Sequence, residues 1–231
     1  CIRDSFLEEI FAECPLRISV KTRVGVNDAG EWEHLLSIYE KFPMEELIIH
    51  PRVQKDFYNN TPDMEAFLYA VENSRHTLCY NGDICSVEDY RTWRQQMEEK
   101  RKCAFMQESG QQTDPEDTGS LVSHLMLGRG VLKNPGLIGE LTGHAPITKD
   151  QFHAFHDDIL KGYLDVMSGE RNTLFRMKEL WFYFAKYFTE PEKYVKQINK
   201  TQHVAEYRVI VDNLFREQEW EPVSYTHLRA H

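Results

Sequence analysis

The stretch ELIIHPRVQKDFYNN, residues 46–60, begins as a buried strand and then changes character abruptly. Its first residues form a short aliphatic run, which is typical of a strand that is covered on both faces. His50, Pro51 and Arg52 follow directly, and a polar, aromatic segment comes after them. An imidazole and a guanidinium therefore stand at the carboxyl end of a predicted core strand.

The same alternation of strand and helix occurs four times along the chain. The predicted strands occupy residues 17–23, 47–50, 77–81 and 124–130. Helix starts are indicated by capping residues at Thr61 with Pro62, Ser86 with Asp89, and Asn134 with Pro135. Repeated strand–helix units predict an α/β fold with a parallel sheet. The polar segment 103–123 lengthens the last unit, and we expect it to be a surface insertion.

Polar or glycine residues end each of the four predicted strands. The clusters are Lys21 with Arg23, His50 with Arg52, Asn81-Gly82-Asp83, and Gly128-Arg129-Gly130. In barrels and doubly wound sheets, ligands lie at the carboxyl ends of parallel strands. Glycines let backbone N–H groups approach an anion closely, and Arg129 adds a bidentate charge. The sequence therefore predicts one shared pocket for an anionic ligand.

Composition narrows the class of protein. The chain has 231 residues, of which 41% are hydrophobic and 28% charged, and this suits one large core or a domain with an appendage. It contains no apolar run of the roughly 20 residues that would span a bilayer. Five cysteines without a C-x-x-C pair favour a reducing, cytoplasmic setting. A net charge of −10 argues against general nucleic-acid binding but permits a local basic surface.

From Thr148 onward the pattern is helical. Thr148 and Gln151 form a capping-box pattern at the start of a helix that reaches about Met167. A packing stripe then predicts the core of a helix bundle, and a further helix is predicted at 203–216. The stripe consists of Leu174, Met177, Trp181, Phe184 and Phe188.

The basic charge is concentrated in the same region. Residues 171–208 include eight Lys or Arg and four Glu, a net charge of +4. RNA phosphates need such a patch, although a merely solvated helix face would have the same pattern. His153 and His156 are three residues apart, but no third ligand is suitably spaced. We expect them to be capping or surface residues, and we predict no metal site.

Four motifs resemble the tRNA-dihydrouridine synthase family in order, spacing and strand context. They are VKTRVG (20–25), IIHPRVQKDFY (48–58), CYNGDI (79–84) and MLGRGVLKNP (126–135). The resemblance extends over about residues 5–216. It implies an FMN-containing (β/α)₈ barrel followed by a helical domain. It also implies reduction of the C5=C6 bond of particular uridines in tRNA, with NADPH as the electron donor.

The resemblance also implies roles for individual residues. Lys21 would face the pyrimidine edge of the flavin, where a cation stabilises negative charge on the reduced ring. The other implied cofactor-binding residues are His50 beside the flavin, Asn81, Gly82 and Asp83 in a first phosphate and ribityl loop, and Gly128 and Arg129 in a second phosphate loop. Arg52 would lie at the mouth shared by the flavin and the target base. Arg176 and Lys178 would contact tRNA.

Part of the family pattern is missing. The family's catalytic cysteine lies in an Asn-x-Gly-Cys-Pro turn well before the lysine that Lys21 matches, yet only 20 residues precede Lys21. We therefore expect an inactive fragment that has the last four of eight barrel strands and five non-catalytic cysteines. The expected parts are a partial FMN-binding barrel at 1–147, a helical tRNA-binding domain at 148–222, and a non-native tail at 223–231 that resembles translated sequencing adaptor.

Two other functions are compatible with parts of this pattern. One is a different FMN or phosphate-binding barrel that acts on a small metabolite, although the basic helical segment does not fit it. The other is a non-catalytic RNA-binding remnant, which the intact Lys21, His50, Asn81 and Arg129 argue against. None of these functional hypotheses requires a membrane or an obligate protein partner.

Overall fold

A computed structural model describes residues 2–57, 60–109 and 122–220. The chain divides into two compact units, Cys1–Ile84 with Glu88–Gly128, and Cys85–Val87 with Arg129–His231. The elements up to the end of the sheet are α1 (Ile2–Glu13), β1 (Ser19–Gly25), η1 (Ala29–Glu31), α2 (Trp32–Tyr39), β2 (Glu46–Val53), η2 (Gln54–Asp56), α3 (Met64–Asn73), β3 (Leu78–Tyr80), α4 (Val87–Ser109) and β4 (Val122–Leu125). The remaining elements are α5 (Arg129–Lys133), α6 (Leu137–Leu141), α7 (Lys149–Val166), α8 (Glu170–Phe184), η4 (Ala185–Tyr187), α9 (Glu192–Lys200) and α10 (Val204–Glu217).

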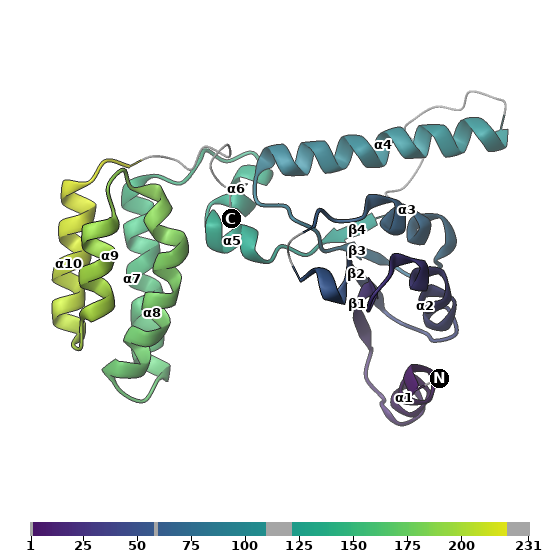
Figure 1. Ribbon diagram of the computed structural model, residues 1–231, viewed down its shortest axis with the longest axis horizontal. Coiled ribbons are helices and arrows are strands. Elements are labelled where there is room, and N and C mark those ends of the chain that lie inside the picture. Colours follow the sequence, from purple (N-terminus) through teal and green to yellow (C-terminus); the bar gives the residue numbers. More distant parts are fainter. Residues whose placement is uncertain (1, 58–59, 110–121, 221–231) are drawn as a thin grey trace. The chain divides into compact units, whose positions relative to one another are not determined.

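The first unit is built on a parallel sheet of four strands in the order β1-β2-β3-β4. This confirms the α/β class and the parallel pairing. The aliphatic run of β2 supplies Leu47 and Ile49, both fully buried. They pack in one apolar cluster with Trp32 of α2 and Phe67 of α3. Figure 1 shows these two helices beside the sheet. The helices therefore cover the face formed by alternate residues of each strand.

Two predicted helix starts are wrong. α3 begins at Met64 and not at Pro62, because Asp63 has the extended backbone of an N-cap and accepts a hydrogen bond from Ala66 N at 3.0 Å. The N-cap of α6 is Gly136. Asn134 instead accepts from Gly136 N at 3.0 Å, so it forms a local turn before the helix.

The last strand and the segment before it also differ from the prediction. β4 ends at Leu125, so Gly128 and Arg129 do not belong to the strand, and Arg129 begins α5. The predicted insertion at 103–123 is partly regular structure, because α4 continues to Ser109 and β4 starts at Val122. Residues 110–121 of that prediction lie outside the described residues.

In the second unit, α7, α8, α9 and α10 pack around an aromatic core (Figure 1). The predicted capping box is confirmed, since Thr148 Oγ1 accepts from Gln151 N at 3.3 Å. All five residues of the predicted stripe are buried, from Leu174 to Phe188. The described residues contain no helix that is both long and apolar enough to cross a membrane.

The prediction for the two histidines of α7 is wrong for His156. This side chain is 1% exposed and lies against Tyr207, whose Oη is 2.7 Å from His156 Nε2. Trp181 Nε1 donates to the same Tyr207 Oη at 2.8 Å. His153 is half-buried and stacks on Phe215, with ring centroids 4.1 Å apart. Both histidines are therefore part of the aromatic packing of the helical unit.

Candidate active site

Lys21 and Asn81 meet across the sheet on the face that the helices leave uncovered. Val20 and Val24 of β1 pack in the core, so the alternation of the strand directs Lys21 the other way. Lys21 Nζ donates a hydrogen bond to Asn81 Oδ1. Asn81 Nδ2 in turn donates to Met126 O at 2.7 Å. The middle of β1 is thus linked to the residues that directly follow β3 and β4, and two predicted site residues are brought together. The prediction that Lys21 ends its strand is wrong, because β1 continues to Gly25.

Charges in this area alter the acidity of two side chains. Partial burial, and then the neighbouring Arg23 guanidinium, lower the pKa of Lys21 below its ordinary value. Cys79 follows the same alternation on β3, and burial together with Glu46 raises the pKa of its thiol to about 11. Cys79 is therefore a neutral thiol near pH 7, as expected of a cysteine that is not a nucleophile.

His50 is a neutral, buried imidazole. Its side chain is 8% exposed, and Arg52 Nη1 lies 3.2 Å from its Nε2. A guanidinium has only donors, so Nε2 accepts and the imidazole proton is on Nδ1. Burial, and then the positive charges of Arg23, Lys21 and Arg52 in that order, together lower the pKa of His50 to about 4. The site therefore gains no charge from His50 at neutral pH.

Arg52 holds the loop after β3 against β2. Its Nη1 and Nη2 donate to the two carboxylate oxygens of Asp83 at 3.0 and 2.5 Å, and its Nε donates to Asn60 O at 2.5 Å. The Arg52 side chain is only 2% exposed, whereas that of Asp83 is 41% exposed. Arg52 supports His50 from inside the fold. Both carboxylate oxygens of Asp83 are engaged in the ion pair with Arg52. This geometry favours a positioning role for both residues over direct contact with a phosphate.

The two glycine loops differ in what surrounds them. A Cβ at Gly82 would lie 2.1 Å from Tyr80 Oη, so the chain's own packing requires glycine there. A Cβ at Gly128 would meet no atom of the described chain within 4 Å. Internal packing of the described residues therefore does not explain glycine at Gly128, which is exposed.

The remaining predicted site residues lie in the second unit. Arg129 is half-buried at the start of α5. Arg176 is exposed on α8, and its Nη1 lies 3.0 Å from Glu179 Oε2. Lys178 is half-buried and donates from Nζ to Thr201 O at 2.7 Å. Arg176 is therefore a surface cation, whereas Lys178 ties α8 to the segment between α9 and α10.

The sequence motifs did not assign a role to Arg23 or Phe57. Arg23 Nη1 donates to Val53 O at 2.8 Å and Nη2 donates to Phe57 O at 3.2 Å, so it braces the segment after β2. Phe57 is 67% exposed and has a φ of 50°, which is rare for a bulky residue and typical of functional loops. Arg23 could have been recognised from its position two residues after Lys21, because this spacing puts both side chains on one face of β1.

Comparison with known proteins identifies the family. The model of the dihydrouridine synthase family matches residues 4–223, so the chain belongs to this family. No curated protein matches the chain. Membership of the dihydrouridine synthase family implies an oxidoreductase that acts on uridine. The four-stranded parallel sheet agrees with part of a barrel.

Proposed function

We propose that the chain is part of an FMN-dependent enzyme that reduces particular uridines of tRNA to 5,6-dihydrouridine, with NADPH as electron donor, in the cytoplasm. The observation that carries this proposal is the Lys21–Asn81 contact beside a neutral His50, in a member of the dihydrouridine synthase family. A cation of β1 that is fixed by an amide is suited to a flavin's polar edge.

The residues present fit an FMN group. An ammonium has three donors, and Asn81 Oδ1 accepts one of them, so Lys21 can donate to a ring carbonyl or nitrogen as well. No described atom crowds Gly128, so an anion can approach its backbone, and Arg129 follows it in the chain. When bound, FMN supplies the reducing equivalents for the C5=C6 bond. Lys21, His50 and Asn81 would hold its ring, the backbone of the Gly82–Asp83 loop would hold its ribityl chain, and the Gly128–Arg129 loop would hold its phosphate.

Lys21 has an electrostatic role in this proposal. Preorganised cations stabilise charge that develops during a reaction because they need no reorganisation at that moment. Asn81 provides this preorganisation, since its carbonyl oxygen is bound to Lys21 and its amide is fixed by Met126 O. His50 stays neutral, so the site is not overloaded with positive charge. Its Nδ1–H is a donor that points away from Arg52.

We assign the proton donor of the reaction to none of the described cysteines. Cys79 lies on the site's face of the sheet, but a thiol whose pKa is raised to about 11 is a weak acid at neutral pH. Arg52 and Asp83 keep the site's geometry and do not transfer protons in this proposal. Arg52 approaches the substrate only through His50 and the loop that it supports.

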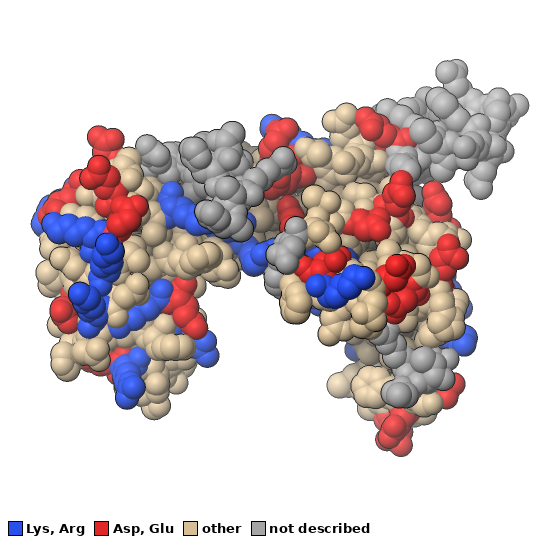
Figure 2. All heavy atoms as spheres, viewed as in Figure 1, with Lys and Arg blue, Asp and Glu red and all other residues tan. Residues whose placement is uncertain are grey.

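For RNA binding we propose residues 148–222 as the main surface and residues 1–147 as the flavin-binding part. The support is the net charge of +4 over residues 171–208, in a chain whose total charge is −10. Figure 2 shows several Lys and Arg side chains on the visible face of the helical unit, with acidic side chains among them and at one end. A base buried in structured RNA must be flipped out at a cost of a few kcal/mol, and phosphate contacts elsewhere offset this cost.

The test is complementation. The complete gene that contains this sequence is expressed in cells without dihydrouridine synthases of their own, and dihydrouridine in the tRNA is measured by mass spectrometry. We expect dihydrouridine with the wild type, and little with Lys21→Met. Lys41→Met, at an exposed position after α2, is the matched control and should retain activity. Absence of dihydrouridine with the wild-type gene would refute the proposal.

A further inference from the structure

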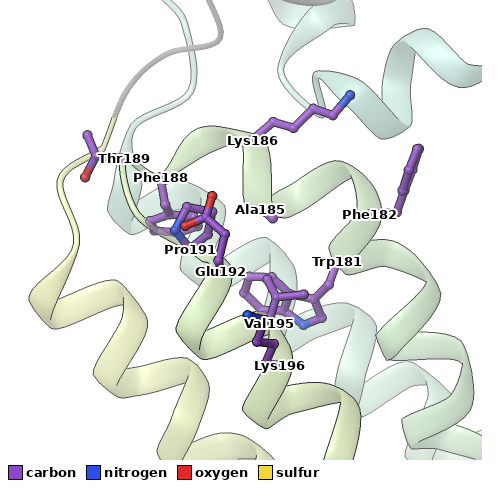
Figure 3. A pocket seen from close by; sticks show the side chains of 10 residues that line it. All are labelled: Trp181, Phe182, Ala185, Lys186, Phe188, Thr189, Pro191, Glu192, Val195 and Lys196. Carbon is purple, nitrogen blue, oxygen red and sulfur yellow. The ribbon is translucent and has the colours of Figure 1, made fainter. Parts of the chain in front are cut away.

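The helical unit has an open groove whose walls come from α8, η4 and α9. Its volume is about 530 Å³, which is within the usual range for small-ligand sites. Trp181 and Phe188 contribute aromatic walls, and Val195 of α9 contributes an aliphatic one. Figure 3 shows these side chains together with Phe182 and Lys186 on the α8 and η4 side and Lys196 on α9. The groove is therefore apolar inside, with a lysine from each side.

Phe182 is the most informative residue of this groove. Its ring is 69% exposed, whereas Trp181 and Phe188 of the same groove are buried. Lys186 Nζ lies 5.3 Å from the centroid of this ring. Leaving a phenylalanine exposed beside a cation gives the fold nothing through packing, whereas it offers a flat apolar surface next to a positive charge.

We propose that this groove binds one unpaired nucleotide of RNA, with its base stacked on Phe182 and the phosphates on its two sides held by Lys186 and Lys196, one by each lysine. Every base has a π-face, so aromatic stacking beside basic groups is the common way to bind single-stranded nucleic acid. Glu192 also lines the groove, and its carboxylate can accept an N–H of the base edge. The basic excess of residues 171–208 favours an anionic partner such as RNA over a basic or neutral one. This inference rests on the proposed RNA substrate but concerns a separate site.

The first test compares two phenylalanines of the same helix in the full 231-residue chain. Phe182 lines the groove, whereas Phe175 is 61% exposed on α8 and does not. The probe is a fluorescein-labelled single-stranded oligouridylate, with a duplex of equal length as the paired form, and binding is followed by anisotropy. We expect Phe182→Ala to weaken binding of the single strand by about 5-fold or more, because base–aromatic stacking contributes that much per base. Phe175→Ala should weaken binding clearly less, since Phe175 lies beside Arg176 but lines no part of the groove, and the duplex should not respond to Phe182.

The second test separates charge from stacking. Lys196→Gln should flatten the slope of log affinity against log salt by about 0.7, the value for one phosphate contact on a single strand. Lys161→Gln, at an exposed position on α7, is the control and should leave the slope unchanged. Phe182→Ala should lower the affinity at every salt concentration with the slope unchanged.

Several results would contradict the proposal that the groove binds RNA. Equal effects of Phe182→Ala and Phe175→Ala would do so, as would an RNA affinity that survives both Phe182→Ala and Lys196→Gln. Self-association in light scattering that Phe182→Ala abolishes without an effect on RNA would assign the groove to a second copy. Failure of the groove proposal can be distinguished from failure of the proposed enzyme function. Oligouridylate binding through Phe182 without dihydrouridine formation refutes the flavin enzyme alone, and full dihydrouridine formation with no Phe182 effect refutes the groove alone.

Discussion

Arg52 on β2 and Asp83 after β3 form a two-pronged ion pair, although 31 residues separate them in the sequence. The pair is asymmetric, because the arginine is buried and the carboxylate is partly open to solvent. Arg52 also contacts His50 Nε2, so one guanidinium fixes both the imidazole and the loop of Asn81 to Asp83. The shape of the candidate site therefore depends on a contact between two of its own predicted residues.

Removing Asp83 should destabilise the first unit. Asp83→Ala leaves a buried guanidinium without its counter-ion, and we expect a loss of roughly 1–3 kcal/mol in the free energy of unfolding. Urea unfolding measures this loss. The control is Glu45→Ala, which breaks the exposed Arg17–Glu45 pair and should cost under about 1 kcal/mol. A cost for Asp83→Ala as small as that for Glu45→Ala would contradict the supporting role of the pair.

His50 should make stability depend on pH. Its pKa falls from 6.5 to about 4 on folding, so the unfolded chain binds more protons between these values. This contribution to stability is complete above pH 6.5 and decreases as the pH falls toward 4. His50→Gln should reduce the difference between urea midpoints at neutral and acidic pH, whereas His34→Gln, at an exposed position on α2, should not. Identical pH profiles for His50→Gln and wild type would count against a buried neutral imidazole.

Arg129 and Lys21 should affect FMN differently in the complete protein. Arg129→Ala removes the proposed partner of the phosphate, a charge-assisted contact of roughly 1.5–3 kcal/mol, and should cause the larger loss of FMN affinity. Lys21→Ala should slow the reaction more than it weakens FMN binding, because Lys21 acts on developing charge. Fluorescence titration with FMN and measurement of flavin reduction separate the two effects. Equal FMN affinities of the two variants would contradict these assignments.

Arg176 and Lys178 should separate RNA binding from stability. Arg176→Glu alters an exposed cation and should weaken tRNA binding, with a flatter dependence on salt. Lys178→Gln removes the hydrogen bond to Thr201 O and should lower the free energy of unfolding by about 1 kcal/mol. Salt-dependent tRNA titration and urea unfolding on both variants make the comparison. Unchanged tRNA affinity and salt slope in Arg176→Glu would move the RNA surface elsewhere.

Tyr207 should be a critical polar residue of the helical core. Tyr207→Phe leaves Trp181 Nε1 and His156 Nε2 buried without their shared partner, and should cost about 2 kcal/mol or more. Tyr183→Phe, at a half-buried position on α8, should change stability by no more than about 0.5 kcal/mol. Thermal unfolding of the two variants gives the comparison. Similar melting temperatures of Tyr207→Phe and Tyr183→Phe would show that water replaces the Tyr207 hydroxyl.

Near-neighbour patterns in the sequence predicted most of the secondary structure. The aliphatic run at Leu47 and the stripe from Leu174 to Phe188 were both found buried, because strand and helix periodicity depend only on local geometry. The capping box at Thr148 was predicted for the same reason, since its two partners are three residues apart. The strand-end clusters also indicated that Lys21 and Asn81 lie at one edge of a parallel sheet.

The identity of each side chain's partner was decided only by the tertiary structure. Asp63, and not Thr61, caps α3, and β4 ends before Gly128, because strand pairing and packing choose among several acceptable local starts and ends. Likewise, the sequence predicted that Lys178 contacts tRNA, whereas its Nζ donates a hydrogen bond to Thr201 O in the structure. A hydrogen bond or ion pair between distant residues depends on distances of a few ångström. Those distances follow from the packing of whole elements, which a linear pattern of residue types does not contain.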